Sequence, residues 1–210
     1  MVSKFRARGT RVSAIAAFAA ALIAAFPAIA SAGCPAAPLS QPFSQFGDTS
    51  WYQLAPSGSF ESGAPGWVGQ SGLLGLMQSG VTVGEGNDAY NLVPGTHSLL
   101  VGTNGYAVSP PVCISSEYPT WRFVAHQLGG ASSSPLNVSL RWVNVLGVGV
   151  ETGAGSLHGY SGWAPSPVMK LANSLPLWMP GGTLMVQLVF RAGAGSSYAV
   201  DDVYLDPYRR

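Results

Sequence analysis

Apolar and polar residues alternate along three stretches in the second half of the chain. The segment 121–126 reads Trp-Arg-Phe-Val-Ala-His, which places Trp121, Phe123 and Ala125 on one side. The same period recurs over 136–143 and 183–190, where Leu, Val, Trp or Phe occupies every second position. A period of two is the side-chain period of a β-strand, so each stretch is predicted to form a strand with one buried face.

Turn-forming residues separate these stretches from one another and from further expected strands. Gly, Pro and Ser gather at 129–135, 153–156 and 180–182. No segment after Gly33 keeps a helical period, and prolines limit any helix within 170–178 to one turn. The further strands are expected at 66–69, 73–83, 97–101, 105–109, 165–172 and 198–205. Short strands joined by turns predict an all-β domain, an antiparallel two-sheet β-sandwich or jelly roll.

Residues 1–32 have the parts of a secretory signal peptide. Basic residues at positions 4, 6, 8 and 11 precede an apolar run over 12–26, and small residues over 28–32 provide a cleavage pattern. A membrane anchor is the alternative, but the run is shorter than the roughly 20 residues that span a hydrocarbon core. We therefore expect export to the extracellular space or cell envelope, cleavage after Ala32 and no membrane span in the mature chain.

Charged residues make up only 9% of the chain, with 10 Lys and Arg against 9 Asp and Glu. An average soluble domain has roughly 25%. Cleavage after Ala32 removes four basic residues, so the mature net charge is 6 − 9 = −3. Nucleic-acid binding needs clustered Lys and Arg to replace phosphate counterions, and the remaining basic residues are mostly scattered. A nucleic-acid partner is therefore not expected.

The chain has 2 cysteines, Cys34 and Cys113. On an exported chain they predict one disulfide, which would tie an N-terminal arm over 33–56 to a β-sandwich over 57–210. Two alternatives stay open. Cys34 follows Ala32 and Gly33 as in a lipoprotein signal, although Ser31 stands where an aliphatic residue is usual. The other alternative is a pair of free, buried thiols.

Two segments near the ends of the predicted sandwich carry a family resemblance. The segment 58–63 reads Gly-Ser-Phe-Glu-Ser-Gly, with Trp67 after it, and 198–205 reads Tyr-Ala-Val-Asp-Asp-Val-Tyr-Leu. They resemble the opening and closing strands of the jelly-roll, galactose-binding-like carbohydrate-binding modules appended to cellulases and xylanases, and 96–101 is similar to another strand of those modules. The arm over 34–54 and the C-terminal segment 206–210 resemble instead the corresponding segments of a group of actinobacterial secreted proteins of unassigned function.

The resemblance implies a structural calcium site. In these modules the Glu of the opening segment and an Asp of the closing strand hold the ion, which here gives Glu61 and Asp201, with Asp202 as the substitute. Two carboxylates brought together without a cation would repel, and calcium prefers oxygen ligands. Neighbouring residues of a strand point to opposite faces, so only one of the two aspartates is expected to face Glu61. The alternative is that these acids end strands in solvent.

Candidate ligand-binding residues lie opposite the apolar stripe of the three clearest strands. They are Arg122, Arg141 and Gln187, with Trp142 and Asn144 at the end of the second strand. The resembling modules bind sugars through aromatic rings and polar side chains, which favours a polysaccharide or cell-wall glycan as the partner. An exposed Arg, however, is more often a solvating side chain than a ligand.

Aromatic residues fall into two groups. Trp67, Trp121 and Trp163 are expected to pack in the core or at strand edges. The candidates for an exposed ring on which a sugar stacks occur in turn-rich surroundings: Trp51, Tyr90, Tyr106, Tyr160 and Trp178.

No motif supports catalysis. The three His residues lack metal-ligand spacing, and the chain has neither a nucleophile elbow nor a phosphate-binding glycine motif. A glycosidase would need two carboxylates facing a substrate, for which the candidates are Glu85, Asp88, Glu117 and Glu151. Acids in turns commonly serve solubility alone, so we do not expect an enzyme.

These observations predict a secreted, non-catalytic module that binds polysaccharide or cell-envelope glycan. The alternative is an extracellular structural or protein-interaction domain with no sugar site. Two or more coplanar exposed rings beside Arg122, Arg141 or Gln187 would favour the first function. A flat face of Ser, Thr and Val would favour the second.

Overall fold

The computed structural model describes Cys34 and the ranges 37–71, 78–115, 120–144, 146–170 and 183–206. All of them belong to one unit of the chain, Gly33–Arg210. The predicted signal peptide, the possible helical turn after Lys170 and the C-terminal residues 207–210 lie outside the described residues. Within these ranges, no helix is long and apolar enough to cross a membrane.

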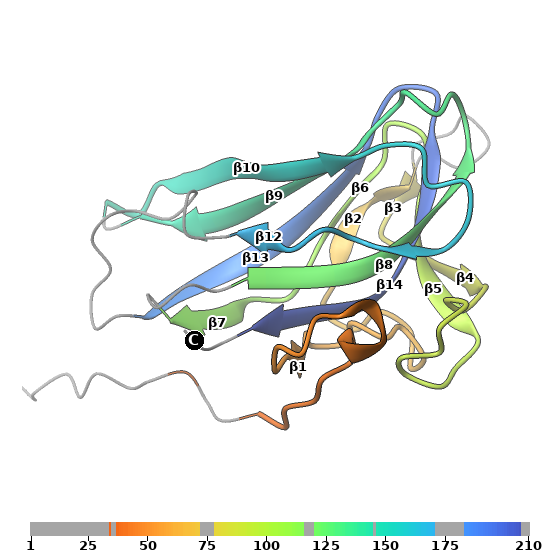
Figure 1. The fold of residues 1–210 in the computed structure, drawn as a ribbon. Coiled ribbons are helices and arrows are strands. Elements are labelled where there is room, and N and C mark those ends of the chain that lie inside the picture. The colour runs from red at the N-terminus through yellow and green to blue at the C-terminus, as the bar shows by residue number, and fades with distance from the viewer. Residues whose placement is uncertain are drawn as a thin grey trace, which may run out of the picture. The chain divides into compact units, whose positions relative to one another are not determined.

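Two antiparallel sheets form the fold, as the alternation predicts (Figure 1). Sheet I has the spatial order β11, β8, β14, β5 and β4, with β1 added to β14 and β12 added to β8. Its strands are β1 (Gln53–Leu54), β4 (Thr82–Glu85), β5 (His97–Val101), β8 (Thr120–Gly129), β11 (Ala164–Pro165), β12 (Met169–Lys170) and β14 (Ser197–Asp206).

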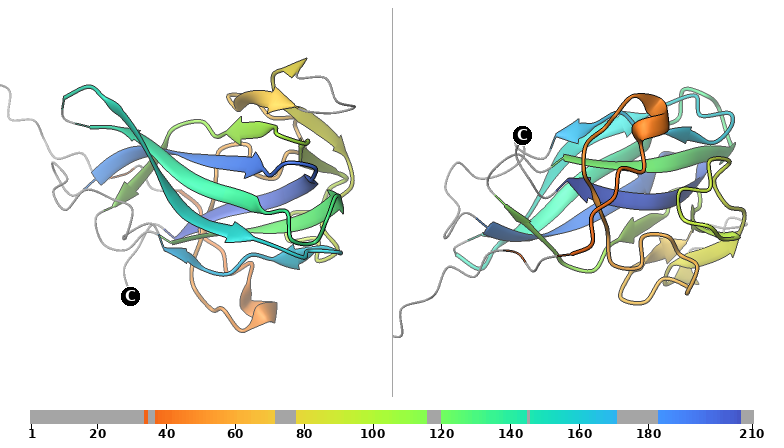
Figure 2. Two further views of the ribbon diagram at one scale, coloured as in Figure 1. Left: turned by 90° about the horizontal axis from the view of Figure 1, so that it is seen from above. Right: turned by 60° about the horizontal axis from the view of Figure 1, so that its bottom comes forward.

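Sheet II has the spatial order β10, β9, β13, β6, β2 and β3, with β7 added to β13. Its strands are β2 (Val68–Ser71), β3 (Gln78–Ser79), β6 (Tyr106–Val108), β7 (Val112–Ser115), β9 (Leu136–Val143), β10 (Gly149–Leu157) and β13 (Thr183–Ala192). Figure 2 shows the two layers from further directions. A short 3-10 turn, η1 (Ser44–Phe46), precedes the first strand.

Aromatic side chains from both sheets meet in the apolar core. Trp121 and Phe123 of β8 face Phe190 of β13, with ring centroids 5.5 and 5.0 Å apart. Trp67 stacks on Phe190 at 6.1 Å. The prediction that Trp67 and Trp121 are core residues is confirmed, since their exposed fractions are 5% and 0%.

β10 corrects one sequence prediction. The segment 153–156 was expected to form a turn, yet it lies inside this strand and pairs with β9, with a register shift between Gly153 and Gly155. Glycine marks a bulge and a close approach here: a Cβ on Gly155 would come within 2.9 Å of the Met169 sulfur. Pairing with β9 therefore overrides the turn preference of the local sequence.

The N-terminal arm covers part of the outer face of sheet I. Phe43 and Tyr52 of the arm are buried against Val124 and Tyr204 in a second apolar cluster. The Phe43 ring meets the rings of Tyr52 and Tyr204 edge to face, at 5.3 and 5.8 Å. Because of this cover, β8 is buried on both faces between 121 and 125, whereas its alternation predicts one buried face.

The beginning and the end of the described sandwich lie side by side. Ala55 donates its backbone N–H to the Val203 carbonyl at 2.8 Å, and the Val203 N–H donates to Gly58 at 3.0 Å. Phe60 and Val203 share the main core. The predicted disulfide between Cys34 and Cys113 is present, with Cα atoms 5.3 Å apart, and it fastens the start of the arm to β7.

Candidate metal centre and ligand-binding face

Three buried aspartates lie together where the loop between β4 and β5 meets β14. Asp88 belongs to the loop, and Asp201 and Asp202 belong to the strand. One carboxylate oxygen of each lies within 4.8 Å of the other two. Their exposed fractions are 4%, 1% and 0%, so water screens their mutual repulsion poorly. These residues are called the aspartate cluster below.

A break in the strand brings Asp201 and Asp202 to the same place. The pairing of β14 with β8 shifts register between Asp201 and Tyr204. Asp202 has a φ of 49°, in the left-handed region, and donates its N–H to Asp201 Oδ1 at 2.8 Å. Both aspartates therefore lie beside Asp88, because the bulge interrupts the period of two. That only one of them reaches Glu61 stays a prediction.

Backbone N–H groups satisfy only some of the oxygens of the aspartate cluster. Asp88 donates to Asp201 Oδ2 at 3.2 Å, Val93 donates to Asp202 Oδ2 at 3.0 Å, and Tyr90 donates to Asp88 Oδ1 at 2.6 Å. Asp88 Oδ2 and Asp202 Oδ1 are buried without a hydrogen-bond partner. These two orphaned acceptors require a proton or a cation.

Burial is the main reason that Asp201 and Asp202 resist ionisation without a counter-charge. It raises the pKa of Asp201 to about 8, and repulsion from Asp88 acts in the same direction. Burial also raises the pKa of Asp202. Three carboxylates with two open acceptors fit a hard cation such as calcium, which takes about six to eight oxygen ligands. Asp88, Asp201 and Asp202 are the residues that would hold it.

Glu61, the predicted partner of Asp201, is not a member of the aspartate cluster. Its carboxylate accepts the backbone N–H groups of Thr96 at 2.8 Å and His97 at 2.9 Å. Burial opposes ionisation of Glu61, but these hydrogen bonds outweigh it and lower its pKa. The Glu61 carboxylate thus fastens the opening segment to β5, and the structure places Asp88 instead beside Asp201 and Asp202. The metal set of Glu61 with Asp201 or Asp202 stays a prediction.

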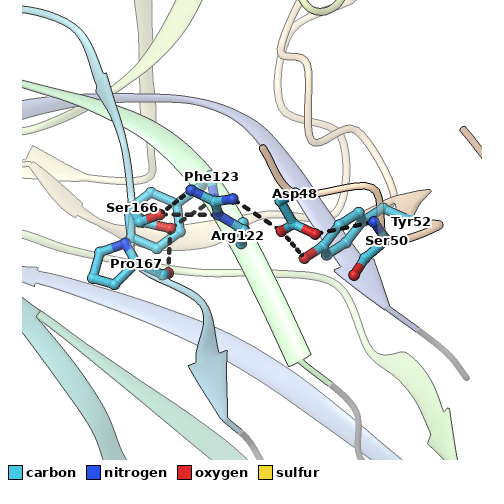
Figure 3. Close-up of polar contacts among 7 residues, drawn as sticks. All are labelled: Asp48, Ser50, Tyr52, Arg122, Phe123, Ser166 and Pro167. Carbon is cyan, nitrogen blue, oxygen red and sulfur yellow. Dashed lines mark hydrogen bonds and ion pairs between the residues drawn. The ribbon is translucent and has the colours of Figure 1, made fainter. Parts of the chain in front are cut away.

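Arg122 is also placed differently from its prediction. It lies on β8 in sheet I, whereas Arg141 and Gln187 lie on β9 and β13 in sheet II. Its guanidinium is buried and donates to Asp48 Oδ2 at 2.9 Å and to the Ser166 carbonyl at 2.8 and 3.0 Å (Figure 3). Arg122 thus joins the N-terminal arm to the β11–β12 segment and does not form a ligand-binding face with the other two.

Asp48 is the centre of this arm contact (Figure 3). It accepts hydrogen bonds from the Tyr52 hydroxyl at 2.7 Å and from the Ser50 N–H at 3.0 Å, in addition to the ion pair with Arg122. Burial alone would raise its pKa, but these donors lower it to about 2. The Arg122 guanidinium also stacks over the Phe43 ring, 4.5 Å from its centroid.

The outer face of sheet II carries a second polar cluster, centred on Glu151 of β10. Oε1 accepts from Ser139 at 2.7 Å and from Arg191 Nε at 3.1 Å, and Oε2 accepts from Arg141 and Arg191 at 3.0 Å each. Burial opposes ionisation of Glu151, but these four donors lower its pKa to about 2. Arg191 also lies over the Tyr106 ring, 5.0 Å from its centroid. These five residues are called the Glu151 cluster below.

The other predicted ligand residues are distributed around this face. Gln187 is the Cα partner of Arg141, and its amide donates to the Ser109 carbonyl at 3.0 Å. Trp142 points into the core and is only 7% exposed, so its ring is not available for stacking. Asn144 accepts the N–H groups of Leu146 and Val148, which makes it a turn residue of the β9–β10 hairpin. The sugar-binding roles of Arg141, Gln187 and Asn144 stay predictions.

The described part of this face does not carry two exposed coplanar rings. Tyr106 is its aromatic residue, and Arg191 lies over that ring. Farther along β9 and β13 come Val143 and Met185, which are 62% and 53% exposed. Trp51 is 47% exposed but lies on the arm, and Trp178 lies outside the described residues. The described part of this face therefore offers a ligand the polar groups of the Glu151 cluster and no pair of exposed rings.

Three charged residues of these clusters were not predicted to belong to them. Arg191 had a signal in the sequence: it continues the period of two through Gln187, so extending that stretch by one residue places it on the same face. Glu151 was not assigned to the binding face because its strand was not predicted. Asp88 had no signal, since only the fold brings its loop to β14.

No protein-family model and no curated protein sequence matches the chain. Among solved structures, it is similar to the N-terminal CBM22-1–CBM22-2 tandem domain from Paenibacillus barcinonensis Xyn10C, at a TM-score of 0.50 and 15% identity, over 76% of this chain and 47% of that chain. The fold is that of a jelly-roll carbohydrate-binding module. A xylan-binding domain from CBM 22 gives a TM-score of 0.49 at 16% identity, covering 78% of this chain and 98% of that chain. TmCBM61 in complex with beta-1,4-galactotriose gives 0.44 at 16% identity, covering 75% and 98%.

Proposed function

We propose that this protein is a secreted, non-catalytic module that binds a polysaccharide. The observation that carries the proposal is the jelly-roll fold shared with tandem carbohydrate-binding modules, together with a cluster of polar groups on one open sheet face. The disulfide supports an oxidising compartment, which agrees with export through the predicted signal peptide. A cell-envelope glycan is the narrower form of the same proposal.

The outer face of sheet II is the proposed binding surface. Arg141, Arg191 and Glu151 have side-chain exposed fractions of 37%, 40% and 30%, so a ligand can reach them. Gln187 and Asn137 flank them on β13 and β9. Arginine forks and amides are donors that suit sugar hydroxyls and ring oxygens.

Two of the candidate carboxylates, Asp88 and Glu151, lie in places that do not suit a glycosidase pair. Asp88 is buried in the aspartate cluster, and Glu151 is held by four donors on an open face. A general acid needs a raised pKa, whereas the pKa of Glu151 is lowered. We therefore propose that the polysaccharide is bound and not cleaved.

Retention on insoluble xylan, β-1,4-galactan and peptidoglycan tests this function. We expect at least one polymer to retain the protein, and the double variant Arg141→Gln/Gln187→Ala to weaken retention without lowering the melting temperature. Lys170→Gln on β12 is the matched control, because it removes a positive charge from sheet I and leaves the side chains of the proposed surface unchanged. If none of the three polymers retained the wild-type protein, the proposal would be contradicted.

One observation favours a protein-interaction domain as the second candidate function. The β9–β10 hairpin exposes Val143, Leu146 and Val148 at 62%, 81% and 55%. Exposed apolar residues in one place are typical of protein contact surfaces. If no glycan is retained, the variant Leu146→Ser should show whether this hairpin mediates association instead.

We also infer that the aspartate cluster holds a structural calcium ion. The two orphaned oxygens and the gathering of three carboxyl groups support this inference. A ligand that binds only the folded state at 100 times its Kd stabilises the protein by about 2.7 kcal/mol. Calcium should therefore raise the melting temperature over that in chelator.

Two variants separate a metal site at the aspartate cluster from the predicted set that contains Glu61. Asp88→Asn should abolish the response of the melting temperature to calcium, whereas Glu61→Gln should lower stability but keep the response, because Glu61 lies outside the cluster. A calcium response that depends on Glu61 and not on Asp88 would restore the predicted set. A wild-type protein that melts alike in calcium and in chelator would end the calcium inference.

A further inference from the structure

The Glu151 cluster carries more positive than negative charge. Two guanidiniums, those of Arg141 and Arg191, share one carboxylate, which leaves a net charge of 2 − 1 = +1. The low pKa of Glu151 keeps this carboxylate ionised, so the count holds at neutral pH. The surplus lies on an open face, where a ligand can reach it.

The positive charge of the Glu151 cluster contrasts with the charge of the rest of the described chain. The other acidic residues of the described ranges all lie on sheet I or on segments packed against it: Asp48, Glu61, Glu85, Asp88, Asp201, Asp202 and Asp206. Arg122 is buried and paired with Asp48. Lys170 of β12 is the other basic residue of sheet I. Within those ranges, acids thus outnumber bases on sheet I and its packed segments, whereas the outer face of sheet II has a surplus of base. An anionic ligand would be attracted to sheet II and repelled from sheet I.

The arginines of the cluster keep donors to spare. Arg141 uses Nη2 on Glu151, and Arg191 uses Nε and Nη2. Their Nη1 groups make no hydrogen bond to any residue that the structure describes. Glu151 and the Tyr106 ring hold the two guanidiniums in place, so little side-chain freedom is left to lose on binding. A fixed guanidinium with free N–H donors suits a carboxylate.

We propose that the outer face of sheet II recognises a polysaccharide that contains uronic acid, with Arg141 and Arg191 contacting the sugar carboxylate. This inference rests on the proposed function and deepens it from glycan binding to acidic-glycan binding. The polar flank of Asn137 and Gln187 contacts the sugar hydroxyls. The described face has one aromatic ring, Tyr106, and Arg191 already lies over it. Ionic contacts would therefore supply the affinity that ring stacking supplies in sugar sites with exposed aromatic residues.

Polygalacturonate and its fully methyl-esterified form are the matched probes, because they share a backbone and differ in the charged group. We expect affinity electrophoresis to show retention by the acid and little by the ester. Retention should also weaken as the salt concentration rises from about 50 to about 500 mM, because this rise shortens the electrostatic screening length about threefold. Arg141→Gln and Arg191→Gln should each weaken binding on the order of tenfold, as for loss of a charge-assisted hydrogen bond. Lys170→Gln should bind like the wild type.

The outcomes separate this inference from the function on which it rests. Equal retention by the acid and the ester, or by neutral xylan, would overturn the preference for uronic acid and leave polysaccharide binding in place. Retention by none of these polymers nor by the neutral galactan and peptidoglycan would overturn both. Melting temperatures of the variants identify any loss of binding that comes from misfolding, and Arg141→Lys, which keeps the charge but loses the fork, should bind with intermediate strength.

Discussion

Buried charged residues in this protein are stabilised by partners that come from distant parts of the chain. Arg122 is paired with Asp48 of the arm and bonded to the Ser166 carbonyl, so its charge is balanced by a nearby carboxylate. The aspartates around Asp202 have no such cation among the described residues, and two of their oxygens are orphaned. Residue type alone does not show whether a buried charge is balanced, because this depends on which groups the fold places around it.

Replacing Asp48 tests the arm contact through pH. The folded pKa of about 2 lies below the ordinary value of 3.8, so ionised Asp48 stabilises the fold above about pH 4 and loses this effect as pH falls toward 2. Asp48→Asn should lower the free energy of unfolding by about 2 kcal/mol at pH 7 and flatten its pH dependence between pH 4 and 2. Urea unfolding across this range measures both effects. Glu85→Gln, an exposed carboxylate, is the control and should change little.

Gly95 is required by the Glu61 contact. A Cβ at this position would lie 1.9 Å from the Glu61 carboxyl carbon. Gly95→Ala should therefore push Glu61 off the Thr96 and His97 amides and cost about 2–3 kcal/mol, as for charge-assisted hydrogen bonds. Gly162→Ala, where a Cβ meets nothing within 4 Å, is the matched control in thermal unfolding. Equal stability of the two variants would show that Glu61 contributes nothing to the fold.

At the scale of elements, β8 and the N-terminal arm depend on each other. The strand buries Trp121 and Phe123 inward and Val124 outward, and the outward face is dry only because Phe43 and Tyr52 cover it. A strand buried on one face shows alternation, whereas a strand buried on both faces is apolar throughout. Because Arg122 lies on the outward face of β8, the sequence predicted a strand with one buried face. The arm supplies both the apolar cover and the counter-charge.

Two aromatic residues of the arm measure how much it contributes. Phe43 is fully buried and Trp51 is 47% exposed. Phe43→Ala should lower the free energy of unfolding by about 3–5 kcal/mol, whereas Trp51→Ala should cost less than about 1 kcal/mol. Guanidinium unfolding of both variants provides the comparison. Similar, small losses would mean that the arm is not part of the cooperative fold.

At the scale of the whole molecule, the disulfide closes a large loop. Cys34 and Cys113 are separated by 79 residues in sequence, and the loop contains the arm and strands β1 to β6. On the chain-entropy model, a loop of this length contributes about 4–5 kcal/mol. The double variant Cys34→Ser/Cys113→Ser should lose stability of this order in guanidinium unfolding, and reduction of the wild type should match it. A loss below about 1 kcal/mol would contradict a structural role.

Local pattern determined the fold class because the alternation in β8, β9 and β13 and the turn residues between them depend only on neighbours in sequence. It also favoured the disulfide, since two cysteines on an exported chain allow one pairing, but lipidation of Cys34 and a pair of free thiols stayed open until the structure placed the two residues together. The resemblance located Asp201 and Asp202 but not their partner. The strand β10 and the role of Glu151 were missed because glycines typical of a turn pair with β9 instead.

The sequence by itself thus determined a two-sheet sandwich with a core of regularly spaced apolar residues, and it favoured a disulfide. Only the tertiary structure decided which polar residues meet: Asp88 joins Asp201 and Asp202 through a bulge, Arg122 turns to the arm, and Arg191 reaches Glu151 across β9. The physical reason is that alternation fixes the face of a side chain within its own strand, whereas strand order, register and bulges fix its neighbours. Those depend on contacts between residues far apart in the chain.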